Sequence, residues 1–166
     1  PADYDAEFEA IFTQKKPGEN STIYICAPSD PLMVKDAGHE SWFVLVNAPR
    51  HDESGQDGFD WRDENFKHKY AHSIIDQIEA HGIKIRERLD VLEIRTPLDL
   101  QESVMAPGGS IYGTSSNSAS AAFLRTKNRS PIKNLFCVGG STHPGGGLPL
   151  VGISAEIVAN AIGRAR

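Results

Sequence analysis

Cysteine is scarce in this sequence, and long apolar runs are missing from it. The two cysteines, Cys26 and Cys137, each lie in a short apolar run, which predicts buried free thiols rather than a secreted disulfide framework. No run approaches the roughly 18 apolar residues that a membrane-spanning helix requires. We therefore expect a cytoplasmic protein whose contact with a membrane, where it occurs, is peripheral.

Basic residues are also fewer than acidic ones, since the sequence contains 17 Lys and Arg but 22 Asp and Glu, and the net charge is -5. The basic residues are scattered among the acids, which leaves no basic face for phosphates and excludes a nucleic-acid partner. The apolar share of 39% and the charged share of 23% are typical of a folded globular protein. The chain opens on Pro1 instead of methionine, which favours a piece of a longer protein.

Hydrophobic periodicity predicts helices and strands in the first half of the chain. Apolar residues recur at helical spacing over residues 5–14 and again over 64–81. β-Branched and aromatic runs at 21–27 and 42–46 predict two strands. Residues 49–60 are acidic and glycine-rich without any period, which predicts a solvated, moving loop.

The second half is predicted to continue with a strand at 91–95 and a short helix over 98–105, which Thr96 caps. It ends in a strand at 134–138 and a helix at about 151–162. Small and apolar residues cover most of this last helix, which predicts that it is buried against a sheet.

The turn between the last predicted strand and helix is rich in glycine, with Gly139, Gly140 and Gly145–147. A strand that enters such a turn and then a helix brings unpaired N–H groups and the positive end of the helix dipole together, which favours an anionic or electron-rich ligand. The motifs of a phosphate loop and of a GxSxG nucleophile elbow are both absent. A turn of purely structural role is the alternative, because tight turns of any function use glycine.

The residues NLFCVGGSTHPGGGLPLVGISAEIVANAI (134–162) resemble the closing motif of the carotenoid (phytoene) desaturase family, a strand, a glycine turn and a small-residue helix. The segments WFVLVNAP and TPLDL, further upstream, are similar to other parts of that family. The resemblance covers essentially the whole chain, and residues 134–162 are its diagnostic part.

This resemblance implies an α/β (mixed α+β) fold, the C-terminal fragment of a Rossmann-type FAD flavoprotein with part of a mixed-sheet substrate domain. Residues 1–129 are expected to belong to the substrate-binding domain, and residues 130–166 to return to the FAD-binding domain. The N-terminal GxGxxG turn that holds the FAD pyrophosphate is not found in this chain. With that N-terminal FAD-binding half missing, the fragment is expected to be inactive alone.

The resemblance also implies which residues contact FAD. The first part of the turn is expected along the ribityl and phosphate side of the cofactor, and the second part beside the flavin ring. His143 is expected to contact FAD rather than to transfer a proton, and no catalytic residue is assigned. The implied FAD-binding residues are Gly139, Gly140, Ser141, His143, Gly146, Gly147, Leu148, Pro149 and Leu150.

The implied reaction is dehydrogenation of a C–C bond of a carotenoid or similar polyene, with a hydride transferred to the flavin. Carotenoid isomerases and retinol-saturase-like flavoproteins share the closing turn and are the alternatives within the superfamily. A flavin-free interaction module is the alternative of another class. Self-association of the fragment is expected, because the strand at 134–138 lacks its parallel partners.

Other candidate sites favour plainer interpretations. His68 and His72 have the spacing of a metal pair but no third ligand, so a solvated helix face is the preferred interpretation and no metal site is predicted. Arg125, Lys127 and Arg129 form a small basic cluster that could meet a lipid or FAD phosphate, and solvation is again preferred.

Overall fold

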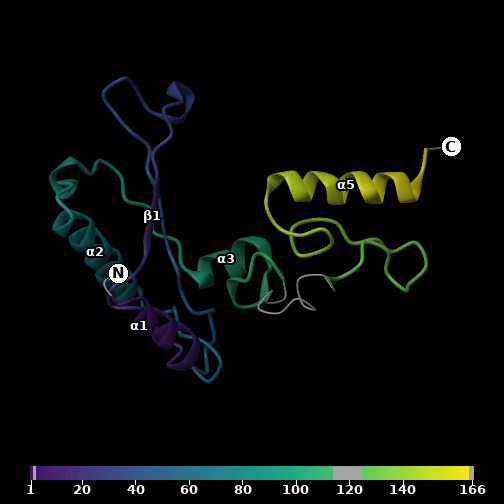
Figure 1. Cartoon of the computed structure of the whole chain (residues 1–166), viewed down its shortest axis with the longest axis horizontal. Coiled ribbons are helices and arrows are strands. Elements are labelled where there is room, and N and C mark those ends of the chain that lie inside the picture. The colour runs from purple at the N-terminus through teal and green to yellow at the C-terminus, as the bar shows by residue number, and fades with distance from the viewer. Residues whose placement is uncertain (2, 114–124, 165–166) are drawn as a thin grey trace. The chain divides into compact units, whose positions relative to one another are not determined.

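The computed structural model of the chain describes residues 1, 3–113 and 125–164 (Figure 1). Its packing divides into two units, Pro1–Gly109 and Ser110–Arg166. The domain boundary expected at 129/130 concerns the domains of a larger enzyme and stays a prediction. The elements are α1 (Tyr4–Phe8), η1 (Glu9–Thr13), β1 (Ile23–Cys26), η2 (Pro31–Met33), β2 (Phe43–Val46), α2 (Glu64–Ala80), η3 (Arg86–Arg88), α3 (Pro97–Val104), η4 (Pro107–Gly109) and α5 (Leu148–Ile162).

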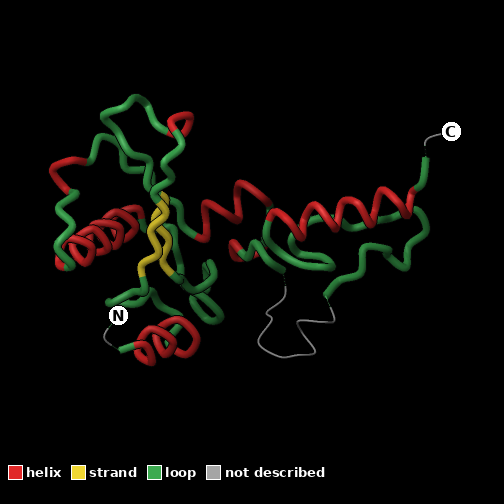
Figure 2. The backbone as a smooth tube through the Cα atoms, turned by 45° about the horizontal axis from the view of Figure 1, so that its top comes forward, coloured by secondary structure: helices red, strands yellow, loops and turns green. Residues whose placement is uncertain are grey.

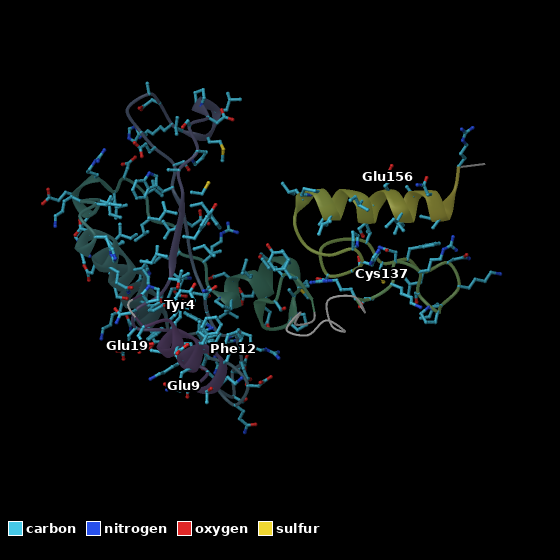
Figure 3. The ribbon with its side chains drawn as sticks, in the orientation of Figure 1. Tyr4, Glu9, Phe12, Glu19, Cys137 and Glu156 are labelled. Carbon is cyan, nitrogen blue, oxygen red and sulfur yellow. The ribbon has the colours of Figure 1, made fainter. Side chains whose placement is uncertain are left out.

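The first predicted helix is confirmed as α1, which continues without interruption into the π-helical turn η1. The Asp3 carboxylate accepts a hydrogen bond from the N–H of Ala6, which caps the helix start. Tyr4, Phe8 and Phe12 follow one another at four-residue spacing. The Tyr4 and Phe8 rings are tilted with centroids 5.7 Å apart, and the Phe8 and Phe12 rings are stacked with centroids 5.6 Å apart. All three rings are exposed, and Figure 3 shows Tyr4 and Phe12 at the foot of this unit.

The two predicted strands in the first half are confirmed as β1 and β2, which pair as an antiparallel two-stranded sheet. Tyr24 lies opposite Leu45 and Cys26 lies opposite Phe43. Figure 2 shows the short ladder with the segment between its strands extending beyond it. Helices and a small sheet give the mixed α/β content that the sequence predicts.

Helix α2 forms as its apolar period predicts, and local features mark both of its ends. The Asp63 carboxylate accepts from the N–H groups of Asn65 and Phe66 at 2.9 and 3.1 Å, which satisfies two free donors of the first turn. Gly82 follows the helix with a φ of 92°, a conformation that favours glycine. The buried face consists of Ile74, Ile75 and Ile78.

Polar side chains attach α2 to the segment that leads into β1. The Gln77 amide oxygen accepts from the Ser21 N–H at 3.1 Å, and the Tyr70 hydroxyl lies 2.9 Å from the Ser21 hydroxyl. Glu7, which is buried, accepts from the Thr22 N–H at 3.1 Å. These part-buried hydrogen bonds hold α1, β1 and α2 in one unit.

Tyr70 makes this packing sensitive to alkaline pH. Burial raises the pKa of its phenol above the ordinary value of about 10, and the hydrogen bond with Ser21 lowers it in part. The folded state therefore holds the proton more tightly than the unfolded state, so the stabilisation is complete below pH ~10 and is lost as pH rises through the folded pKa. Unfolding in urea can be measured by the fluorescence of Trp61. We expect the urea concentration at the unfolding midpoint to fall more steeply from pH 9 to 11 in the wild type than in Tyr70→Phe. Tyr24→Phe, at an exposed position, should keep the wild-type slope; equal slopes in all three proteins would contradict the assignment.

The predicted loop at 49–60 contains neither helix nor strand, and its base is well anchored. The Trp61 indole N–H donates to the Pro49 carbonyl at 3.1 Å, and the His51 N–H donates to the Gly108 carbonyl at 2.9 Å.

Helix α3 begins as predicted at Thr96, whose N–H and hydroxyl bind the Asp99 carboxylate in a capping box.

Two predicted strands are wrong. Residues 91–95 have no ladder partner in the described part of the chain and run as an irregular segment into α3. Residues 134–138 form a single bridge, between Phe136 and Arg129. A lone extended segment gains no ladder of hydrogen bonds, so apolar content alone does not make it a strand.

The last helix and the two cysteines also differ from expectation. Helix α5 is confirmed but starts at Leu148, earlier than predicted. Its buried residues are Ser154 and Val158, while Leu148, Ile153 and Ile157 are exposed, so the predicted burial against a sheet is wrong for this chain. The thiols are free as predicted, yet Cys26 is exposed and Cys137 is half-buried. In each case the apolar face lacks a covering element among the described residues.

Candidate functional site

The glycine turn closes on itself before α5 begins. The Thr142 N–H and hydroxyl both donate to the Gly139 carbonyl, at 3.2 and 2.9 Å. Gly139 has a φ of 122°, which only glycine adopts without strain. A Cβ at Gly140 would lie 3.5 Å from the Cα of Gly146, so the two predicted halves of the site are neighbours. The fold therefore brings together the glycines that the sequence singled out.

A buried polar cluster holds this turn against α5. It consists of Asn128, Thr142 and Ser154, and Ser154 is 0% exposed. The Asn128 side-chain amide lies 2.9 Å from both the Ser154 hydroxyl and the His143 carbonyl. The Ser154 hydroxyl in turn accepts from the Gly139 N–H at 3.2 Å. Because buried polar groups need partners, this cluster fixes the path of the turn.

Sequence reasoning missed the polar cluster. Ser154 was visible only as a polar residue inside an apolar helix, and Asn128 lies outside the glycine motif. The structure shows that the Asn128 amide also lies 3.1 Å from the Cys137 carbonyl. A polar residue at an otherwise apolar helical position is the signal that could have pointed to this cluster.

The N-terminus of α5 is open. Gly147 is its N-cap, with φ 96° and ψ 143°, and within the described residues no side chain caps the helix. Pro149 has no N–H, so the free donors of the first turn belong to Leu148 and Leu150. No acidic residue lies in this turn, and an added Cβ at Gly147 would meet no described atom within 4 Å. An accessible, uncapped helix start of this kind fits an anionic or electron-rich ring.

Tyr112 and Arg125 flank the turn from the preceding segment. A Cβ at Gly146 would overlap the ring of Tyr112, so glycine is required for this close approach. The Arg125 guanidinium donates to the Tyr112 carbonyl at 2.8 Å and to the Gly140 carbonyl at 3.5 Å. Arg125 thus supports the turn through backbone groups.

The far end of α5 is also bound by an arginine. The Arg129 guanidinium donates to the Ala161 carbonyl at 3.3 Å and lies 5.7 Å from the centroid of the Phe136 ring. Cations near a helix C-terminus stabilise it. Figure 3 places Glu156 on the side of α5 away from Cys137, so the helix rests on the segment that contains Cys137.

His143 and Ser141 are exposed on the turn. The His143 N–H donates to the Thr126 carbonyl at 2.9 Å and its own carbonyl accepts from Asn128, so its backbone shapes the turn. Contact of these two side chains with FAD stays a prediction.

The remaining candidates do not form a site. Within residues 3–113 and 125–164 no group of three or more His, Cys, Asp or Glu is placed to hold a metal ion. His68 and His72 are both exposed on α2, which agrees with the preferred solvated-face interpretation. None of the described helices is both long enough and apolar enough to cross a membrane.

A glycine turn that opens an uncapped helix is typical of a segment that contacts a nucleotide-type cofactor. Comparison with known proteins identifies relatives of the chain. The chain is 41% identical over 163 residues to a 1-hydroxycarotenoid 3,4-desaturase of a Flavobacterium species, matching 96% of this chain and 32% of that protein. It is 31% identical over 161 residues to a lycopene-forming phytoene desaturase of Pseudescherichia vulneris, matching 95% of this chain and 32% of that protein.

A third relative carries a different name. A 4,4'-diapolycopene oxygenase of a Methylomonas species is 30% identical over 163 residues, which cover 93% of this chain and 31% of that protein. No family model matches the chain. The chain is thus similar over nearly its whole length to two carotenoid desaturases and a carotenoid oxygenase, and it spans about a third of the length of these curated relatives.

Proposed function

We propose that the chain is the C-terminal part of an FAD-dependent enzyme that dehydrogenates C–C bonds of a carotenoid or similar polyene. The observation that carries this proposal is the open start of α5, where the N–H groups of Leu148 and Leu150 are uncapped beside Gly147. The names of the relatives support the polyene substrate. The parent protein is the longer protein to which the chain would belong.

The residues of the turn would hold and orient the cofactor. Gly139 and Gly147 leave their Cβ sides open, so backbone can approach a flat ring closely. The Leu148 and Leu150 N–H groups, at the positive end of α5, would stabilise negative charge on that ring. FAD, when bound, supplies the hydride acceptor for the chemistry.

The polar cluster gives this arrangement its rigidity. Asn128 and Ser154 hold the turn at its two ends, and a preorganised backbone loses less entropy when the cofactor binds. No residue of this chain is assigned as the base that accepts the proton from the neighbouring carbon.

The function is tested on the parent protein. Incubated with FAD and an acyclic carotenoid such as neurosporene or lycopene, it is expected to lengthen the conjugated system and shift the visible absorption band to longer wavelength. A product that gains oxygen would assign it to the oxygenases, to which the relative from Methylomonas belongs by name. An unchanged carbon skeleton with altered double-bond geometry, or a saturated bond, would overturn dehydrogenation in favour of isomerase or saturase activity.

The chain alone is proposed to lack half of the FAD site. When the 166-residue chain is mixed with FAD and passed through a gel-filtration column, we expect no flavin absorption to elute with the protein. The parent protein, run as the control, should retain flavin at about one per chain. Flavin retained by the isolated chain would contradict this part of the proposal.

A further inference from the structure

The segment 110–113 packs against the glycine turn, although the two lie far apart in the sequence. An added Cβ at Gly113 would lie 3.0 Å from the Ser141 carbonyl oxygen. An added Cβ at Gly140 would lie 3.8 Å from the Ile111 carbonyl oxygen. The backbone of the segment therefore follows the backbone of the turn closely, and the residue between these two contacts is carried to the same place.

That residue is Tyr112, and its ring lies on the bare backbone of Gly146. The ring carbons Cδ1 and Cε1 occupy the space that a Cβ at Gly146 would need. The Arg125 guanidinium holds the main chain at this point, since it donates to the Tyr112 carbonyl at 2.8 Å. Tyr112 nevertheless remains 56% exposed. A ring that is fixed on one side and largely uncovered offers a surface on which a second flat ring can stack.

The charge of this unit favours an electron-rich ring over a cation as the ligand of Tyr112. Aromatic faces attract cations as well as other rings, so exposure alone does not choose between them. An added Cβ at Gly145 would lie 3.4 Å from the Arg125 Nε, which places positive charge beside the turn. The basic residues of the unit Ser110–Arg166 are Arg125, Lys127, Arg129, Lys133, Arg164 and Arg166, against Glu156 as its one acidic residue. Such a surround repels cations.

We propose that Tyr112 contacts the isoalloxazine ring of FAD and forms one side of the cofactor site, an inference that rests on the proposed function. The backbone next to Gly146, at residues 147–150, is the part of the turn proposed to hold that ring. A flat ring seated there meets the ring of Tyr112, which lies on Gly146 itself. Stacking of the two rings fixes the plane of the flavin and shields that part of it from water. Tyr112 is therefore a cofactor-contacting residue that lies outside the glycine motif.

The fluorescence of FAD bound to the parent protein tests this contact without a measurement of activity. A tyrosine ring in contact with isoalloxazine quenches its fluorescence, because the phenol transfers an electron to the excited flavin and then takes it back; phenylalanine cannot do so. In Tyr112→Phe we expect FAD to bind as in the wild type and its fluorescence lifetime to lengthen. Tyr112→Ala, which loses the ring, should bind FAD about tenfold more weakly. Tyr4→Phe, at an exposed position on α1, is the matched control and should keep the wild-type lifetime.

Two outcomes would overturn the contact. The first is an equal flavin lifetime in the wild type, Tyr112→Phe and Tyr4→Phe with FAD bound to all three, and the second is unchanged FAD affinity in Tyr112→Ala. Hydrogen exchange of residues 139–147 in the FAD-free proteins shows whether Tyr112→Ala has loosened the turn. If it has, the lifetime of Tyr112→Phe decides, because its ring still packs on Gly146. A wild-type parent protein that binds no flavin would instead refute the proposed function itself.

Discussion

Replacing Asn128 with alanine is expected to lower the free energy of unfolding of the unit Ser110–Arg166 by about 3 kcal/mol. The two N–H groups of the Asn128 amide lie within hydrogen-bond distance of the His143 carbonyl, the Cys137 carbonyl and the Ser154 hydroxyl, so alanine removes two donors from these three acceptors. Each buried polar group left without a partner costs about 1–3 kcal/mol. The glycine turn would then separate from α5.

Hydrogen exchange of the backbone measures this effect where it arises, because both tryptophans lie in the other unit. In Asn128→Ala we expect the amides of residues 139–143 and of the middle of α5 to exchange about a hundredfold faster. Asn160→Ala is the matched control, since Asn160 lies exposed on α5 and alanine favours the helix. Equal exchange in the two variants would show that the polar cluster does not hold the turn.

Replacing Gly147 with alanine is the second change with a large expected effect. Gly147 has a φ of 96° and a ψ of 143°, a region that side chains avoid, so alanine is expected to cost about 1–3 kcal/mol of stability. The added methyl group meets no described atom within 4 Å, so the loss of stability comes from the backbone conformation. The loss of FAD affinity comes from the methyl group on the surface that would contact the cofactor. In the parent protein we expect FAD affinity to fall roughly tenfold to a hundredfold.

Gly152→Ala, on the same helix, is expected to raise stability, whereas Gly147→Ala lowers it. Gly152 lies inside α5 with no described atom within 4 Å of an added Cβ, so alanine should stabilise the helix by about 1 kcal/mol. Titration of the FAD-free parent protein with FAD, followed by flavin fluorescence, measures both variants. FAD affinity that falls equally in Gly147→Ala and Gly152→Ala, or in neither, would contradict a specific role for the helix start.

Local signals in the sequence predicted the helices well, because their causes lie within the element. Asp63 and Gly82 mark the ends of α2, and Thr96 marks the start of α3, each through a bond or a conformation confined to a few residues. The glycine turn was predicted for the same reason, since positive φ at Gly139 and Gly147 is a local requirement.

The failures have a common physical origin in long-range pairing. A strand at 91–95 or 134–138 requires a neighbour that donates and accepts along its whole length, and sequence periodicity cannot tell whether that neighbour is present. The burial predicted for α5 and Cys26 fails likewise, because it assumes a covering surface. The polar cluster escaped prediction because Asn128, Thr142 and Ser154 come together only in the folded chain.

Self-association of the isolated chain is still expected, but for a different physical reason. The unpaired strand at 134–138 on which it was based does not form in the described residues. Exposed apolar surface remains on α5 and on the aromatic residues of α1 and η1, and we propose that these surfaces, covered in the parent protein, drive association of the isolated chain.

The most direct test of the account is a crystal structure of the parent protein with FAD bound. We expect backbone atoms of residues 146–150 to lie in van der Waals contact with the isoalloxazine ring, at about 3.5–4 Å, with Gly139 on the ribityl side. A flavin ring that touches none of the residues from 139 to 150 would contradict the proposed role of the glycine turn.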